Sequence, residues 1–66
     1  MTRQAVLRKL VSVASEQGTV AQRVDAVLHA IDTGELFLYS AERRVFNTFR
    51  SEIVGLLRTE LEKTTG

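Results

Sequence analysis

The chain has 66 residues, so it forms one domain at most, and a domain of this size buries only roughly 60% of the surface of its unfolded chain. It has no cysteine and one histidine, which excludes disulfides and thiolate zinc sites. Nine basic and eight acidic residues give a net charge of +1, which neither indicates nor excludes nucleic acid as a partner. Small domains without disulfides or metals are often stabilised by oligomerisation, so we expect a homodimer.

The first segment, residues 2–17, has the pattern of an amphipathic helix. Its polar residues fall on one side of a helical wheel, and the other side holds Val6, Leu7, Leu10, Val11, Val13 and Ala14. Gly18 follows at the position where a left-handed C-terminal cap is expected. The sequence therefore predicts a helix that ends just before this glycine.

The second segment, residues 19–32, begins with a capping signal. Thr19 and Gln22 have the T-x-x-Q spacing of a capping box, in which each side chain accepts a hydrogen bond from a free backbone N–H. An apolar stripe follows at helical spacing, formed by Val20, Val24, Val27, Leu28 and Ile31. Gly34 lies just beyond, so we expect the helix to end near Ile31 or Asp32.

Residues 36–39 form a short apolar run between Gly34 and Ser40. The run fits a buried strand, which would need the same segment from a second copy as its partner. It also fits an early start of the third helix. The preferred prediction makes Ser40 the N-cap, with Glu42 in the first turn, where the helix dipole favours an acid.

The third segment, residues 41–63, is predicted to be one long helix with an unusually wide apolar face. Its apolar residues span roughly half of the circumference, compared with the ~100° stripe of an ordinary surface helix. A 66-residue chain has little of its own body to cover so wide a face. We therefore expect a second copy or another partner to cover part of it.

The wide face divides into two stripes. The first, formed by Val45, Phe49 and Leu56, is predicted to pack on the two preceding helices. Arg50 lies at the edge of the arc, where it either sets the orientation of a partner through ion pairs or extends to water. The second stripe is predicted to form a homodimer interface, and it consists of Phe46, Ile53, Val54, Leu57 and Leu61.

A segment around residues 11–31 resembles helix-turn-helix proteins. Ala14 followed by Gly18 has the spacing of the small residue and the turn glycine of that motif, and the valines at 13, 24 and 27 fall on its core positions. The resemblance implies that Gln22 and Arg23 lie on the exposed start of a recognition helix, where side chains reach base edges. Phosphate contacts would come from the basic residues of the first segment, Arg3, Arg8 and Lys9.

No catalytic constellation is indicated. Asp32-Thr33-Gly34 matches the signature tripeptide of aspartic proteases, but that chemistry needs two carboxylates held by a β-rich scaffold. Asp25 and His29 share an exposed helix face without an oriented nucleophile beside them. We therefore expect no enzyme activity, no catalytic residue, no cofactor and no metal.

The sequence predicts an all-α, three-helix domain over residues 1–66, in which a short helical hairpin packs against a long C-terminal helix. No apolar run is long enough for a membrane span or a signal peptide, so we expect a cytoplasmic protein with no membrane contact. The leading hypothesis is a small non-catalytic protein–protein interaction module, an adaptor, modulator or inhibitor, that acts as a helical homodimer. The alternative is a DNA-binding transcriptional regulator that uses the segment around 11–31.

Overall fold

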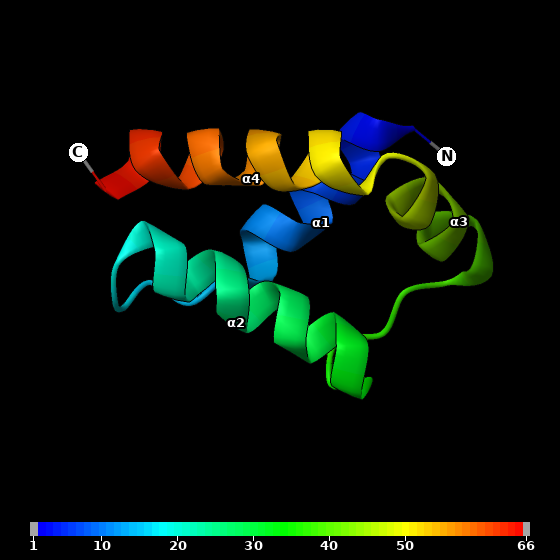
Figure 1. Cartoon of the computed structure of the whole chain (residues 1–66), viewed down its shortest axis with the longest axis horizontal. Coiled ribbons are helices and arrows are strands. Elements are labelled where there is room, and N and C mark those ends of the chain that lie inside the picture. The colour runs from blue at the N-terminus through cyan, green and yellow to red at the C-terminus, as the bar shows by residue number, and fades with distance from the viewer. Residues whose placement is uncertain (1, 66) are drawn as a thin grey trace.

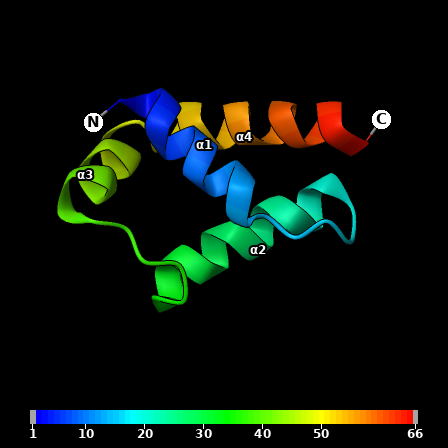
Figure 2. The same cartoon turned by 180° about the vertical axis from the view of Figure 1, so that it is seen from behind.

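The computed structural model describes residues 2–65, with side chains for residues 2–63. Within residues 2–65 the chain forms four α-helices, namely α1 (Arg3–Val13), α2 (Val20–Thr33), α3 (Ser40–Thr48) and α4 (Arg50–Thr65). α2 and α4 lie side by side and run in opposite directions, α1 packs against α4 and α3, and α3 closes one end (Figures 1 and 2). The all-α class is confirmed, while four helices replace the predicted three.

The start of α2 follows from local sequence. Thr19 Oγ1 accepts a hydrogen bond from the Gln22 amide at 3.1 Å, and Gln22 Oε1 accepts one from the Thr19 amide at 2.9 Å. At the other end Gly34 takes a left-handed conformation with φ of 84°, which a residue with a Cβ rarely adopts. The predicted capping box and glycine stop are both confirmed.

The first helix is shorter than predicted, because α1 ends at Val13 and not near Gln17. After Val13 the Ser15 hydroxyl accepts a hydrogen bond from the Gln17 amide at 3.1 Å. The Ser15 carbonyl accepts one from the Arg23 side chain. Both bonds satisfy backbone groups outside a helix, and the first is the kind by which a serine hydroxyl competes with helix continuation.

Residues 35–39 form neither a strand nor the start of a helix, but an extended connection. The Leu36 amide donates to the Ala30 carbonyl at 3.0 Å, which ties the connection to the end of α2. α3 begins at Ser40, and the Glu42 side chain caps it by accepting from the Tyr39 amide at 2.8 Å. The predicted start of the third helix was therefore correct to within one residue.

The predicted long helix over 41–63 is broken at Phe49, whose φ of −115° and ψ of 31° are not helical. An unbroken helix over residues 40–65 would be about 39 Å long at about 1.5 Å per residue. The longest extent of the molecule is 32 Å, so such a helix would extend beyond the elements that cover it. The break lets α3 close the end of the bundle while α4 runs along α2 (Figure 1).

The break also exchanges the roles of the two predicted stripes. Phe46, Ile53, Leu57 and Leu61 fill the core and are at most 1% exposed, whereas Phe49 and Leu56 are both 39% exposed. The wheel grouped the members of each stripe correctly across the break, but it could not show which stripe the other helices would cover. The structure thus corrects the placement of the second stripe, which is core and not outer surface.

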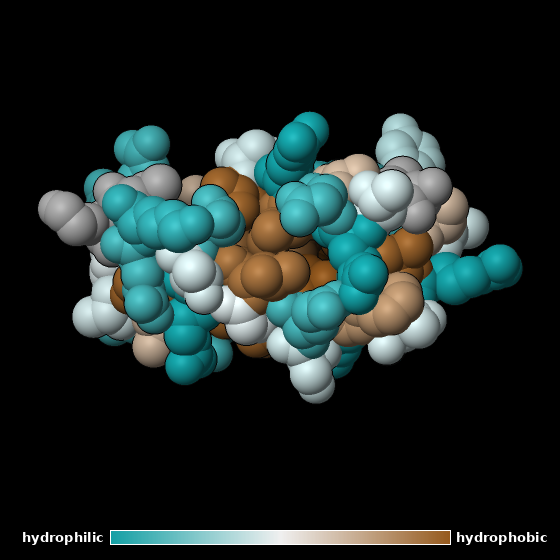
Figure 3. All heavy atoms as spheres, turned by 90° about the horizontal axis from the view of Figure 1, so that it is seen from above, coloured by the Kyte–Doolittle hydropathy of each residue, from teal (hydrophilic) through white to brown (hydrophobic). Residues whose placement is uncertain are grey.

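The core side chains come from all four helices and from Leu38 in the connection, within the described residues. They are Val6, Leu7, Leu10, Val24, Val27, Ile31, Leu38, Phe46, Ile53, Leu57 and Leu61. Some large apolar side chains remain exposed, namely Val13, Phe37, Tyr39, Phe49 and Leu56. Figure 3 shows hydrophobic side chains gathered in the middle of the face along which α4 runs.

Candidate protein-binding surface

The remaining residues of the predicted dimer interface lie outside the core. Val54 is half-buried at the edge of the core cluster. Arg50 is exposed, and its guanidinium lies 5.2 Å from the centre of the Phe46 ring. Arg50 therefore stands at the border of the apolar region, as the wheel predicted, and it covers a core aromatic ring by a cation–π contact.

The two residues predicted to read base edges both form hydrogen bonds within the chain. Arg23 is 6% exposed, and its Nε donates to the Ser15 carbonyl. Gln22 is exposed at the start of α2, as predicted, and its side chain forms the capping box with Thr19. Residues 14–19 between α1 and α2 are also longer than the three- or four-residue turn of a helix-turn-helix. Arg23 was predicted to be exposed, and the structure shows that it is buried.

The predicted phosphate contacts are mostly paired within the chain. Arg3 binds Glu52 at 2.6 Å and lies over the Phe49 ring, with its guanidinium carbon 4.6 Å from the ring centre. Lys9 binds Glu42 at 2.8 Å. Arg8 is exposed and forms no ion pair with a described residue, so it is the member of this set that remains available to a partner.

The most exposed aromatic side chains lie on the connection between α2 and α3. We call residues 35–39 the aromatic segment. Leu36 and Leu38 turn inward, whereas Phe37 and Tyr39 are 62% and 65% exposed. The two exposed rings contact each other edge to face, with centres 5.0 Å apart. Large aromatic groups in water are enriched at surfaces that bind other proteins.

Three contacts hold the aromatic segment in place. Its start is tied to α2 by the bond from Leu36 to Ala30. Its end is tied by Glu42 Oε1, which accepts from both the Tyr39 amide and Lys9 Nζ at 2.8 Å. The Lys9 ammonium also lies 5.2 Å from the centre of the Tyr39 ring. Phe37 and Tyr39 therefore project from a fixed backbone.

The Glu42 carboxylate accepts both hydrogen bonds at the end of the aromatic segment, from Lys9 and from the Tyr39 amide. The hydrogen bond from Lys9 and, after it, the bond from the Tyr39 amide hold the pKa of the Glu42 carboxyl below its usual range, against the opposing effect of burial. Both bonds favour the ionised carboxylate. The anchor of the aromatic segment is therefore charged at neutral pH and linked to α1.

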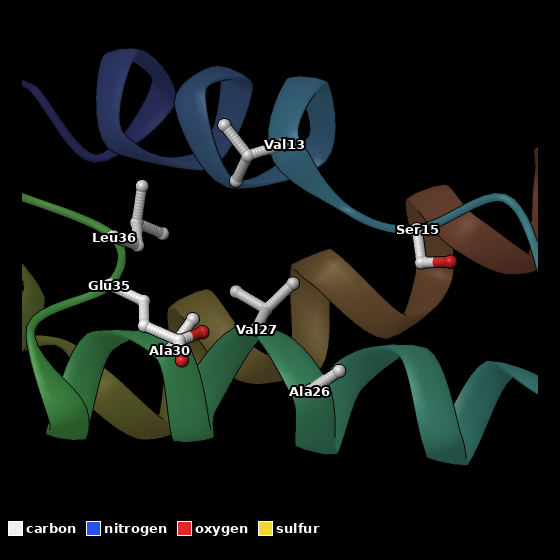
Figure 4. Close-up of a pocket in the computed structure, with 7 residues that line it drawn as sticks. All are labelled: Val13, Ser15, Ala26, Val27, Ala30, Glu35 and Leu36. Atoms are coloured by element: carbon white, nitrogen blue, oxygen red, sulfur yellow. The ribbon is translucent and has the colours of Figure 1, made fainter.

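A shallow apolar groove adjoins the aromatic segment. We call it the α1–α2 groove; its volume is about 310 Å³, and its lining consists of Val13, Ser15, Ala26, Val27, Ala30, Glu35 and Leu36. Figure 4 shows Val13 of α1 and Val27 of α2 facing the space between the helices, with Leu36 at one end. Glu35 and Leu36 line the groove and also belong to the aromatic segment, so the groove adjoins this segment, and we treat the two together as the candidate site.

Sequence reasoning missed this site, although a signal for it was present. The apolar run over residues 36–39 has large side chains at every position, which an extended chain places alternately on its two sides. With one side buried, the other must remain in water unless a partner covers it. The pairing of Lys9 with Glu42 had no such signal, since these residues are far apart in sequence.

The candidate site is an apolar surface that carries two exposed aromatic rings. No group of three or more His, Asp or Glu side chains among the described residues is placed to hold a metal ion. No helix within residues 2–65 is both long and apolar enough to cross a membrane. No protein-family model, curated protein or solved structure matches this chain.

Proposed function

We propose that the protein is a small non-catalytic module that binds another protein through the aromatic segment and the α1–α2 groove, and that it acts as a homodimer. The observation that carries this proposal is the exposed pair Phe37 and Tyr39 on a backbone held by Glu42. Aromatic anchors in the middle of a protein interface supply much of its binding energy.

The fixed backbone supports the proposal on energetic grounds. Burying one exposed ring of this size contributes about 1.5–3 kcal/mol. Ordering a flexible loop on binding would offset part of that gain. Because the contacts of Leu36, Tyr39 and Glu42 already order the segment, little of the gain is lost in this way.

A DNA-binding regulator remains the second proposal, and one observation favours it. α1 carries three basic residues and no acidic one, and α3, which contacts α1, adds the exposed Arg43 and Arg44. With Arg23 buried, such binding would use phosphate contacts and not base edges. Binding of duplex DNA that falls steeply with salt and weakens in an Arg8→Ala variant would support it.

The test is capture of a partner from a nuclease-treated lysate of the native host. We expect the tagged protein to retain a defined protein and a Phe37→Ser/Tyr39→Ser variant to lose it, because the variant lacks both aromatic anchors. Arg44→Ser is the matched control, since it replaces an exposed residue of similar size on α3. Equal retention by the wild type and the aromatic variant contradicts the proposed site, and retention that nuclease abolishes favours the DNA-binding proposal.

A further inference from the structure

A second groove lies between α1 and α4. It consists of two adjoining hollows of about 270 and 300 Å³ that share Gln4. Its apolar lining is Leu7 and Val11 from α1 and Leu56 from α4. Leu56 is 39% exposed although it lies in the middle of a helix, so this groove has an uncovered apolar centre.

The two rims of this α1–α4 groove carry opposite charges. Arg3 and Arg8 line it from α1, and Glu52 and Glu60 line it from α4. At one end Arg3 and Glu52 bridge the groove within the chain at 2.6 Å. At the other end Arg8 and Glu60 line the same hollow without an ion pair between them, and Glu60 has only an exposed contact of 3.4 Å with Lys63.

We infer that the α1–α4 groove is the surface through which two copies of this chain pair, with a twofold axis along the groove. Rotation about that axis places the α1 rim of each copy over the α4 rim of the other. Arg8 of each copy then meets Glu60 of the second copy. Leu56 of each copy covers the apolar lining that α1 of the second copy contributes. This inference deepens the proposed function, because it names the pairing surface of the proposed homodimer.

The charges on the two rims of the α1–α4 groove favour a second copy as its partner, and they also favour one orientation of the twofold axis. A surface with one basic and one acidic rim is complementary to itself, which a twofold dimer requires. A twofold axis across the groove would instead place the two basic rims together and the two acidic rims together. Such like-charge contacts are unfavourable, so the axis along the groove is preferred.

The pairing surface and the aromatic segment can be tested separately. In Figure 1 α4 runs along the top of the molecule, whereas the connection that carries the aromatic segment lies below it at the side of α3. Each surface has an exposed apolar residue, which is Leu56 in the α1–α4 groove and Phe37 on the aromatic segment. Substituting each by aspartate gives a matched pair of variants.

The experiment is sedimentation equilibrium over a concentration series, with circular dichroism to show that each variant is folded. We expect the wild type to form a dimer, Leu56→Asp to raise its dissociation constant at least about tenfold, and Phe37→Asp to leave it unchanged. Arg8→Glu and Glu60→Arg alone should each weaken pairing, because each places like charges together. The double variant Arg8→Glu/Glu60→Arg should restore it.

A wild type that stays monomeric throughout the series overturns the inference. Equal weakening by Leu56→Asp and Phe37→Asp places the interface elsewhere, and a double variant no tighter than the single ones rejects the orientation. Failure of the protein-binding site has a different signature. In that case Phe37→Ser/Tyr39→Ser retains its captured protein, whatever the sedimentation of Leu56→Asp.

Discussion

Two sets of large apolar side chains differ in this molecule in their exposure to water. Ile53, Leu57 and Leu61 on α4 are buried by the neighbouring helices, whereas Phe37 and Tyr39 on the connection remain largely in water. The first set holds the fold together, and the second is the exposed pair on which the proposed binding depends. Hydrophobicity alone does not separate the two sets, because the difference comes from which elements pack on each segment.

Comparing the buried set with the exposed set predicts that substituting a core side chain has the largest effect on stability. Leu57→Ala should lower the free energy of unfolding by about 2–5 kcal/mol, because it removes a fully buried side chain and leaves a cavity. A domain of this size rarely has more than about 3–5 kcal/mol from its core, so the variant should be largely unfolded. Urea unfolding followed by circular dichroism measures the change.

The neighbouring residue provides the control. Leu56→Ala makes the same chemical change one position away, at a side chain that is 39% exposed. We expect a much smaller loss of stability, measured at a concentration where the protein is monomeric. Equal losses for the two variants would mean that α4 does not present Leu57 to the core.

Local features of the fold were predictable from the sequence, and the long-range ones were not. The Thr19–Gln22 capping box and the glycine stop at Gly34 depend on residues within one turn of each helix end, and both formed as predicted. The break at Phe49 depends on how much of a long helix the other elements can cover. Because periodicity carries no information about that cover, the sequence exchanged the roles of the two stripes, which both run across the break.

The same limit applies to the candidate site. An exposed arginine at the start of a helix and a buried one have the same sequence signal, and the hydrogen bond from Arg23 to Ser15 depends on the path of residues 14–19. Glu42 was correctly expected in the first turn of a helix, but its bond with Lys9 joins residues 33 positions apart. Contacts of this kind follow from the packing of α1 against α3.

A smaller effect is predicted at the buried arginine. Arg23→Ala should lower the free energy of unfolding by about 1–3 kcal/mol, because it removes a buried side chain and leaves the Ser15 carbonyl without this donor. Gln22→Ala, which removes half of the capping box, should cost about 1 kcal/mol or less. If Arg23→Ala keeps full stability and loses affinity for DNA, the arginine serves binding and not the fold.

The smallest effect expected is a change in the pH dependence of stability at Glu42. Its pKa is lowered in the folded protein, so ionised Glu42 contributes stability that is complete above its ordinary pKa near 4.5 and is lost as the pH falls through the lower folded pKa. Glu42→Gln should therefore destabilise the protein at neutral pH and have less effect in acid, where the wild-type carboxyl is protonated. Urea unfolding at about pH 7 and about pH 3 measures the difference.

Two further variants show whether this pH dependence comes from the anchor of the aromatic segment. Lys9→Met removes the main cause of the lowered pKa and should reduce the acid-dependent loss of stability in the same way as Glu42→Gln. Glu16→Gln changes an exposed glutamate that has no ion pair among the described residues, and should leave the loss as in the wild type. A pH dependence that is the same in all four proteins would mean that the Lys9–Glu42 pair does not stabilise the fold.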